Sequence, residues 1–194
     1  MGLNLSRVSF ADWLGPDIDF KQFIKKLKTK LGMEIPYINW TVVDEKYPRV
    51  GSYSAYGVFV LCLYYISIGD FEKDLEEDME IELEALKSFR ELFKPKTNNI
   101  PYVEHFINTN DSDTIFLPIL FENPVKIDCL DLASLPAATK ALEVFSEFCG
   151  FNLEYHFDEE YKECKWVPFS TVKNIARILY NFFKEKPESC VAFS

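Results

Sequence analysis

The sequence is poor in the two residue types on which nucleotide and metal sites most often depend. It has two histidines, His105 and His156, and seven glycines among 194 residues. The glycines form neither a phosphate-binding loop nor a dinucleotide-binding fingerprint, so no such site is indicated. A lone histidine beside aromatic residues, as in EYHF at 154–157, is more often packed than catalytic. We therefore predict no cofactor.

Cysteines are too few and too widely spaced for a disulfide framework or a thiolate zinc site. Their number is odd and no two form a C-x-x-C pair; they are Cys62, Cys129, Cys149, Cys164 and Cys190. The amino terminus lacks the basic and then apolar segments of a signal peptide. The longest apolar run, 55–68, is shorter than the roughly 20 residues that a membrane span needs. We expect a soluble, cytoplasmic protein without a membrane partner.

Basic residues are outnumbered, and the excess of acids is local. The chain has 21 Lys and Arg against 31 Asp and Glu, a formal net charge of −10. The segment 70–84 holds nine acids and Lys73, so it carries −8 and the rest of the chain −2. The nine acids are Asp70, Glu72, Asp74, Glu76, Glu77, Asp78, Glu80, Glu82 and Glu84. Such a surface does not suit nucleic acid, whose counterions are displaced by Lys and Arg. It suits a basic protein partner.

Apolar and aromatic residues, in contrast, are abundant. Hydrophobic residues make up 48% of the chain and aromatic residues 16%, far more than a disordered chain contains. A chain of this length can bury one well-developed core. We predict a single domain over residues 1–194.

Helical features dominate the hydrophobic pattern. The segment 17–32 has one apolar stripe, a solvated face of lysines and a stop at Gly32; Ser134 and Gly150 similarly bound a second helix. A third helix is expected to start at Ser170 or Thr171. The full set of expected helices is 17–32, 54–68, 70–93, 134–150 and 170–182. The predicted fold class is mainly α, about five helices with a small β element, and a single-domain α+β fold is the alternative.

The sequence predicts an extended conformation for two segments. TIFLPILFENPVKIDCL at 114–130 is rich in branched and aromatic residues but is interrupted by Pro118 and Pro124. It predicts one or two short edge strands or extended packing segments. NLEYHF at 152–157 alternates apolar and polar residues and predicts a short strand.

The stretch RVGSYSAYGVF at 49–59 places Ser52 and Ser54 around a tyrosine, as an active site would. A nucleophile elbow, however, requires G-x-S-x-G, and neither serine has glycines at that spacing. Either serine can instead act as a helix N-cap and bond an otherwise unpaired backbone N–H. We interpret this stretch as the start of the helix at 54–68.

The loop INTNDSD at 107–113 concentrates oxygen ligands that could hold Ca²⁺ or Mg²⁺. The glycine and glutamate that an EF-hand loop requires are not at the expected places, and Asn and Asp are also the common residues of turns. We predict no metal here. The alternative is a metal-assisted hydrolase in which Asp111 and Asp113 meet His105 or His156.

Three stretches, taken in order, resemble a group of uncharacterised bacterial proteins with GSYS and N-x-S-D motifs. The corresponding letters are GSYSAYGVF at 51–59, INTNDSD at 107–113 and FCGFNLEYH at 148–156. The helix after Gly51 lacks the arginines of that group, and Thr114 stands where the group continues with an acidic residue. The group has no established activity, so the resemblance implies a shared fold and not a function.

Together these features predict a non-catalytic intracellular protein that binds another macromolecule through an acidic surface. The sharpest version is an immunity or inhibitor protein that neutralises a basic toxin or nuclease. The residues expected to bind are Asp70, Glu72, Asp74, Glu76, Glu77, Asp78 and Glu80. Besides the hydrolase, the other alternative is a structural subunit of an oligomer. The sequence does not give the oligomeric state.

Overall fold

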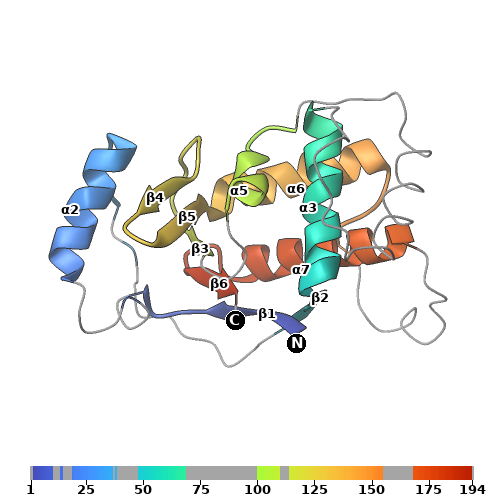
Figure 1. Cartoon of the computed structure of the whole chain (residues 1–194), viewed down its shortest axis with the longest axis horizontal. Coiled ribbons are helices and arrows are strands. Elements are labelled where there is room, and N and C mark those ends of the chain that lie inside the picture. Colours follow the sequence, from blue (N-terminus) through green and yellow to red (C-terminus); the bar gives the residue numbers. More distant parts are fainter. Residues whose placement is uncertain are drawn as a thin grey trace.

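The chain folds around a six-stranded mixed β-sheet with helices on both faces (Figure 1). The computed structural model describes residues 2–10, 14, 19–36, 38, 48–68, 100–109, 114–154 and 168–193. The strand order is β2-β1-β6-β3-β5-β4. The strands are β1 (Gly2–Arg7), β2 (Arg49–Ser52), β3 (Thr114–Leu117), β4 (Val125–Ile127), β5 (Leu130–Ser134) and β6 (Val191–Phe193). The fold class is therefore α+β.

The prediction of a mainly α fold is wrong, because it missed β1, β2, β6 and all but the first residue of β5. Each strand is three to six residues long, too short for a clear alternation. The pairing also joins distant segments, since β1 pairs with β6 from the other end of the chain. In β1, the alternating residues Leu3, Leu5 and Arg7 are buried. Because one of the three is an arginine, the sequence of this strand does not show the alternation of apolar and polar residues that predicts a buried face.

The extended segment 114–130 contains more sheet than the sequence predicted. It provides β3, β4 and the first residue of β5, and Pro118 and Pro124 lie immediately outside β3 and β4. β3 is not an edge strand, because it pairs in parallel with β5 and antiparallel with β6. Pro118 thus follows the last residue of β3 and Pro124 precedes the first residue of β4, so neither proline interrupts a hydrogen-bonded ladder.

Two hydrophobic cores lie against the two faces of the sheet. The larger packs beneath α3 (Tyr53–Ile68), α5 (Glu104–Ile107), α6 (Leu135–Cys149) and α7 (Pro168–Glu185), and the smaller beneath α2 (Phe20–Leu31). Figure 1 shows α2 standing apart beside β4, while α3, α6 and α7 lie together over the other part of the molecule. Successive side chains of β3 point to opposite faces of the sheet, so Phe116 packs in the larger core and Leu117 in the smaller.

Several helix boundaries predicted from capping residues are confirmed. Gly32 ends α2 in the left-handed conformation, as predicted, whereas the helix begins at Phe20, after the N-cap Asp19, and not at residue 17. Ser52 accepts from the N–H of Ala55 and so caps α3. Ser134 caps α6 by accepting from the N–H of Ala137. These caps are local in sequence, which is why the sequence alone locates them.

Other predictions for these segments fail or lie outside the described residues. α7 begins at Pro168, so neither Ser170 nor Thr171 is its cap. The apolar residues that helical spacing places on one face of this helix are all buried: Val172, Ile175, Leu179 and Phe182. In the expected strand at 152–157, the described residues 152–154 form no strand. Asn152 accepts from the N–H of Glu154 there, as in a turn. The expected helix at 70–93 lies outside the described residues. Among the described helices, none has the length and hydropathy required to cross a membrane.

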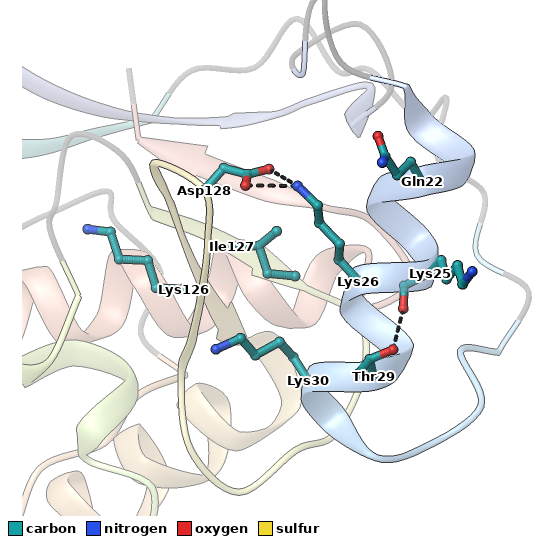
Figure 2. Close-up of a pocket in the computed structure, with 8 residues that line it drawn as sticks. All are labelled: Gln22, Lys25, Lys26, Thr29, Lys30, Lys126, Ile127 and Asp128. Atoms are coloured by element: carbon teal, nitrogen blue, oxygen red, sulfur yellow. Dashed lines mark hydrogen bonds and ion pairs between the residues drawn. The ribbon is translucent and has the colours of Figure 1, made fainter.

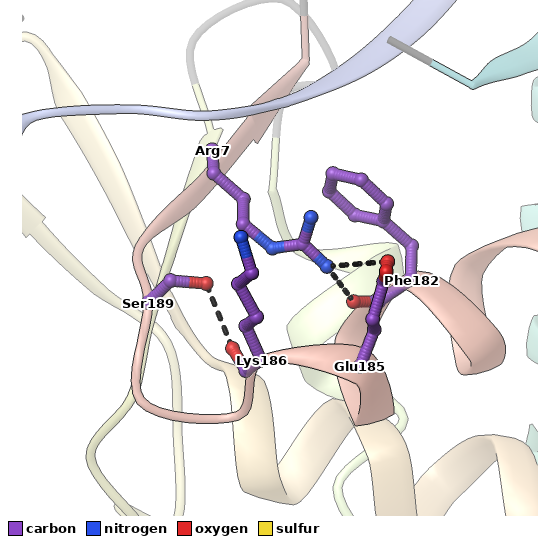
Figure 3. Close-up of polar contacts among 5 residues, drawn as sticks. All are labelled: Arg7, Phe182, Glu185, Lys186 and Ser189. Atoms are coloured by element: carbon purple, nitrogen blue, oxygen red, sulfur yellow. Dashed lines mark hydrogen bonds and ion pairs between the residues drawn. The ribbon is translucent and has the colours of Figure 1, made fainter. Parts of the chain in front are cut away.

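Arg7 joins β1 to the end of α7 (Figure 3). Its side chain is fully buried, and Nη2 donates to the carbonyl oxygen of Phe182 at 2.9 Å and to the carboxylate of Glu185 at 3.1 Å. The guanidinium carbon lies 4.0 Å from the centre of the Phe182 ring. A cation is favourable here because the last carbonyls of a helix carry partial negative charge.

Candidate functional site

A groove lined with charged side chains lies between α2 and the hairpin of β4 and β5. It has a volume of about 530 Å³. Figure 2 shows residues of the helix on one side and residues of the hairpin on the other. The lining residues are Gln22, Lys25, Lys26, Thr29, Lys30, Lys126, Ile127 and Asp128. Four of the eight are lysines.

The helical wall follows from the amphipathic sequence of α2. Phe23 and Leu27 are buried in the smaller core and fix the rotation of the helix. With these residues facing inward, Lys25, Lys26 and Lys30 are exposed. The helix contains five lysines and no acidic residue between Phe20 and Leu31. The helix therefore presents a strongly basic face within an acidic protein.

The hairpin wall is fixed by a two-residue turn. Ile127 pairs with Leu130, so Asp128 and Cys129 form the turn between β4 and β5. Asp128 has φ of +55°, a conformation that Asp tolerates better than most other residues. Lys26 holds this carboxylate from the opposite wall, with its Nζ 2.9 and 2.8 Å from the two Oδ atoms. This ion pair joins the two walls of the groove (Figure 2).

Two of the four groove lysines have no ion-pair partner in the described part of the chain. Lys26 is paired with Asp128, and Lys126 lies 3.5 Å from Asp131 across the hairpin. Within the described part of the chain, Lys25 and Lys30 form no ion pair. Lysines held on one face without partners create a local positive potential, which concentrates anions. Chemically, the groove can bind a carboxylate or phosphate through its lysine ammonium groups.

His105, the one residue of the hydrolase alternative that the structure describes, forms hydrogen bonds that stabilise the fold. Its side chain is fully buried. Nδ1 accepts from the N–H of Ser134 at 3.1 Å, and Nε2 lies 3.1 Å from the carbonyl oxygen of Phe121. This arrangement requires the neutral tautomer with hydrogen on Nε2. Desolvation on burial lowers the pKa of His105, more than the carbonyl of Phe121 and the charge of Glu104 raise it. Neither ring nitrogen is available for a metal or a proton transfer.

The buried thiols are likewise unsuited to nucleophilic chemistry. Burial raises the pKa of Cys149 and of Cys190 to about 12 and raises that of Cys62 well above its ordinary value. A thiol attacks as its thiolate, so these three remain inactive near neutral pH. Cys129 is exposed, and all four described cysteines are free.

The residues predicted to bind lie outside the described residues. These are Asp70, Glu72, Asp74, Glu76, Glu77, Asp78 and Glu80, and the same holds for Asp111, Asp113 and His156 of the hydrolase alternative. In the described part of the chain, no three His, Cys, Asp or Glu residues are grouped as a metal site requires.

The sequence interpretation missed the lysine groove. It assigned the lysines of α2 to a solvated face, which is the usual role of such residues. Five lysines in one helix were the available signal. The opposing wall could not be inferred, because Lys126 and Asp128 are about a hundred residues further along the chain.

The structure is that of an α+β protein with a charged groove between α2 and the edge of a mixed sheet. Comparison with protein-family models, with curated proteins and with solved structures found no match to this chain. Function must therefore be argued from the chemistry of the chain itself.

Proposed function

We propose that this is a non-catalytic binding protein of immunity or inhibitor type, which recognises a basic protein partner through the acids of segment 70–84. One observation carries the proposal: this segment holds −8 of the net −10 charge. Concentrated charge steers a partner of opposite sign and increases the rate of association. It also rejects acidic competitors and nucleic acid, which is itself a polyanion.

The roles of reactive side chains in the described part of the chain support binding over catalysis. His105 uses both ring nitrogens to connect a loop and a strand. Three thiols are held in their protonated form by burial. Because both ring nitrogens of His105 are hydrogen-bonded to the backbone, only His156 is left as the histidine of the hydrolase alternative. We also infer a cytoplasmic location, since the four described cysteines form no disulfide, as is typical of a reducing compartment.

The test is a charge reversal in the acidic segment. Proteins captured from the native host by the full chain are identified and purified, and their affinity for the chain is measured by calorimetry at several salt concentrations. Glu72, Glu76, Glu77 and Glu80 are then changed together to lysine. We expect this variant to lose at least a hundredfold in affinity, about 2.7 kcal/mol, because each attraction becomes a repulsion. The affinity of the unchanged protein should fall as salt rises.

A matched control separates the acidic segment from total charge. Glu34, Glu122, Glu154 and Glu188 are exposed, and changing these four to lysine alters the net charge by the same amount. This control should bind within about threefold of the unchanged protein, since screening limits distant charges. Equal binding by both variants, or a partner that is not basic, would refute the proposal.

A further inference from the structure

We propose that the lysine groove between α2 and the β4–β5 hairpin binds an acidic segment of a partner protein. None of the groove residues belongs to segment 70–84, and their charge is opposite to that of the segment, so the proposal goes beyond the function proposed above. It depends on the groove residues alone. Either surface can fail its test without affecting the other.

The local charge of the groove differs in sign from that of the whole chain. Four lysines line it against one carboxylate, that of Asp128. The net charge of −10 opposes an acidic ligand at long range. At physiological ionic strength, however, the Debye length is about 8 Å, so a ligand in the groove mainly experiences the nearby lysines. Of these, Lys25 and Lys30 form no ion pair in the described part of the chain.

The groove already contains one example of the contact that we propose. The ammonium group of Lys26 lies 2.9 and 2.8 Å from the two carboxylate oxygens of Asp128. Both side chains remain about half exposed, at 46% and 49%. A carboxylate from another chain would meet the same donor chemistry at Lys25 and Lys30, one on each side of Lys26 in the helix sequence. The groove is therefore suited to single carboxylates at separate points.

The composition of the walls favours a peptide over nucleic acid. No aromatic side chain and no arginine is among the eight described residues that line the groove. Single-stranded nucleic acid binds by stacking its bases on aromatic rings, and arginine offers the planar fork that matches phosphate. Asp128 also repels a backbone that carries a charge on every phosphate. A peptide with carboxylates at alternate positions can avoid it.

Ile127 forms the floor of the groove and lies between Lys126 and Lys26 in Figure 2. Because Ile127 is only 3% exposed, the apolar surface open to a ligand comes mainly from the methylene stems of the lysines. Lysine stems cover apolar surface while their charged ends remain in water. The ligand that fits best therefore alternates acidic residues with small or aliphatic ones.

The probe is a short fluorescent peptide with glutamates at alternate positions, separated by serine and leucine. Its binding to the full chain is measured by fluorescence anisotropy in about 0.15 M NaCl. A peptide with glutamine in place of glutamate is the neutral control. We expect the glutamate peptide to bind and the glutamine peptide not to bind. The double variant Lys25→Gln/Lys30→Gln should weaken binding about five- to tenfold, as expected for two exposed ion pairs.

The matched control is Lys140→Gln/Lys184→Gln, which removes two lysines from α6 and α7 and leaves the groove intact. Its Kd should stay within about twofold of the unchanged protein. The proposal is overturned if the glutamate peptide does not bind, if the glutamine peptide binds equally, or if both double variants weaken binding alike. It is also overturned if a single-stranded oligonucleotide of equal charge binds more tightly with the same lysine dependence, which would assign the groove to nucleic acid.

Discussion

At the scale of residues, His105 shows how a side chain with catalytic potential serves packing. Its two ring nitrogens connect the backbone at Phe121 with the backbone at Ser134, and Ser134 in turn caps α6. The imidazole therefore links a loop, a strand and a helix start in a place that water does not reach. Loss of either bond would leave a buried polar group unsatisfied, at a cost of about 1–3 kcal/mol.

This role predicts a specific dependence of stability on pH. Because burial lowers the pKa of His105 below its ordinary value of 6.5, the unfolded chain takes up a proton before the folded chain does. The contribution of His105 is therefore fully present above pH 6.5 and is lost as the pH falls through the folded pKa, with a slope of at most about 1.4 kcal/mol per pH unit. Urea unfolding measured between pH 7.5 and 5 should show this decrease.

The variant His105→Gln provides the comparison. It should be less stable at pH 7.5 by about 1–3 kcal/mol, because glutamine does not reproduce both hydrogen bonds. Its free energy of unfolding should also fall less steeply with decreasing pH than that of the unchanged protein. Parallel pH profiles for the two proteins would show that His105 does not titrate as its environment predicts.

At the scale of elements, the two ends of the chain meet in the centre of the sheet. β1 and β6 pair antiparallel, with Leu5 opposite Phe193 and Arg7 opposite Val191. Arg7 then bonds the end of α7, the helix that precedes β6. One buried side chain thus holds together a strand from the beginning of the chain and a helix from its end.

We expect Arg7→Met to destabilise the fold by about 2–4 kcal/mol. The substitution keeps an unbranched side chain but removes the charge-assisted hydrogen bonds to Phe182 and Glu185 and leaves a buried carbonyl with fewer donors. Glu185→Gln is the matched variant and should cost less than about 1 kcal/mol, because that carboxylate is partly exposed. If both variants lower the free energy of unfolding equally in denaturant titrations, the stabilisation comes from the ion pair with Glu185 and not from the hydrogen bond to the carbonyl of Phe182.

At the scale of the whole molecule, one sheet separates two cores and so couples them. Phe116 packs in the larger core, with its ring 5.0 Å from Phe183 and 5.9 Å from Phe193 between centroids. Leu117, the next residue of β3, packs in the smaller core beneath α2. Neither core can be disrupted without disturbing the same central strand. The lysine groove depends on this arrangement, because α2 is held in place by the smaller core.

This coupling predicts that the molecule unfolds as one unit. Phe116→Ala should cost about 3–5 kcal/mol and Leu117→Ala about 2–5 kcal/mol, although the two side chains face opposite cores. Each variant should show a single transition, with the calorimetric enthalpy equal to the van't Hoff enthalpy. Two separate transitions in Leu117→Ala, with the larger core surviving, would divide the chain into two domains and contradict the prediction of one.

The local features of α2 and α6 were predictable in detail. Ser134 and Gly150 bound α6 and Gly32 ends α2, as predicted, although α2 begins at Phe20 and not at residue 17. Each cap acts on a backbone group within a few residues, so no knowledge of distant contacts is needed. The buried positions of α7 were predictable for the same reason, since helical spacing places them on one face.

The sheet and the groove belong to the tertiary structure. Three-residue strands such as β4 and β6 carry too few residues for a pattern, and pairing across the length of the chain has no local signal. The groove likewise needs Lys25 and Lys126 on opposing walls. The sequence by itself determined helix ends, inward faces and the distribution of charge, because those depend on neighbouring residues. Strand order, the burial of Arg7 and the meeting of the two walls were decided only by packing, which joins residues that the sequence keeps far apart.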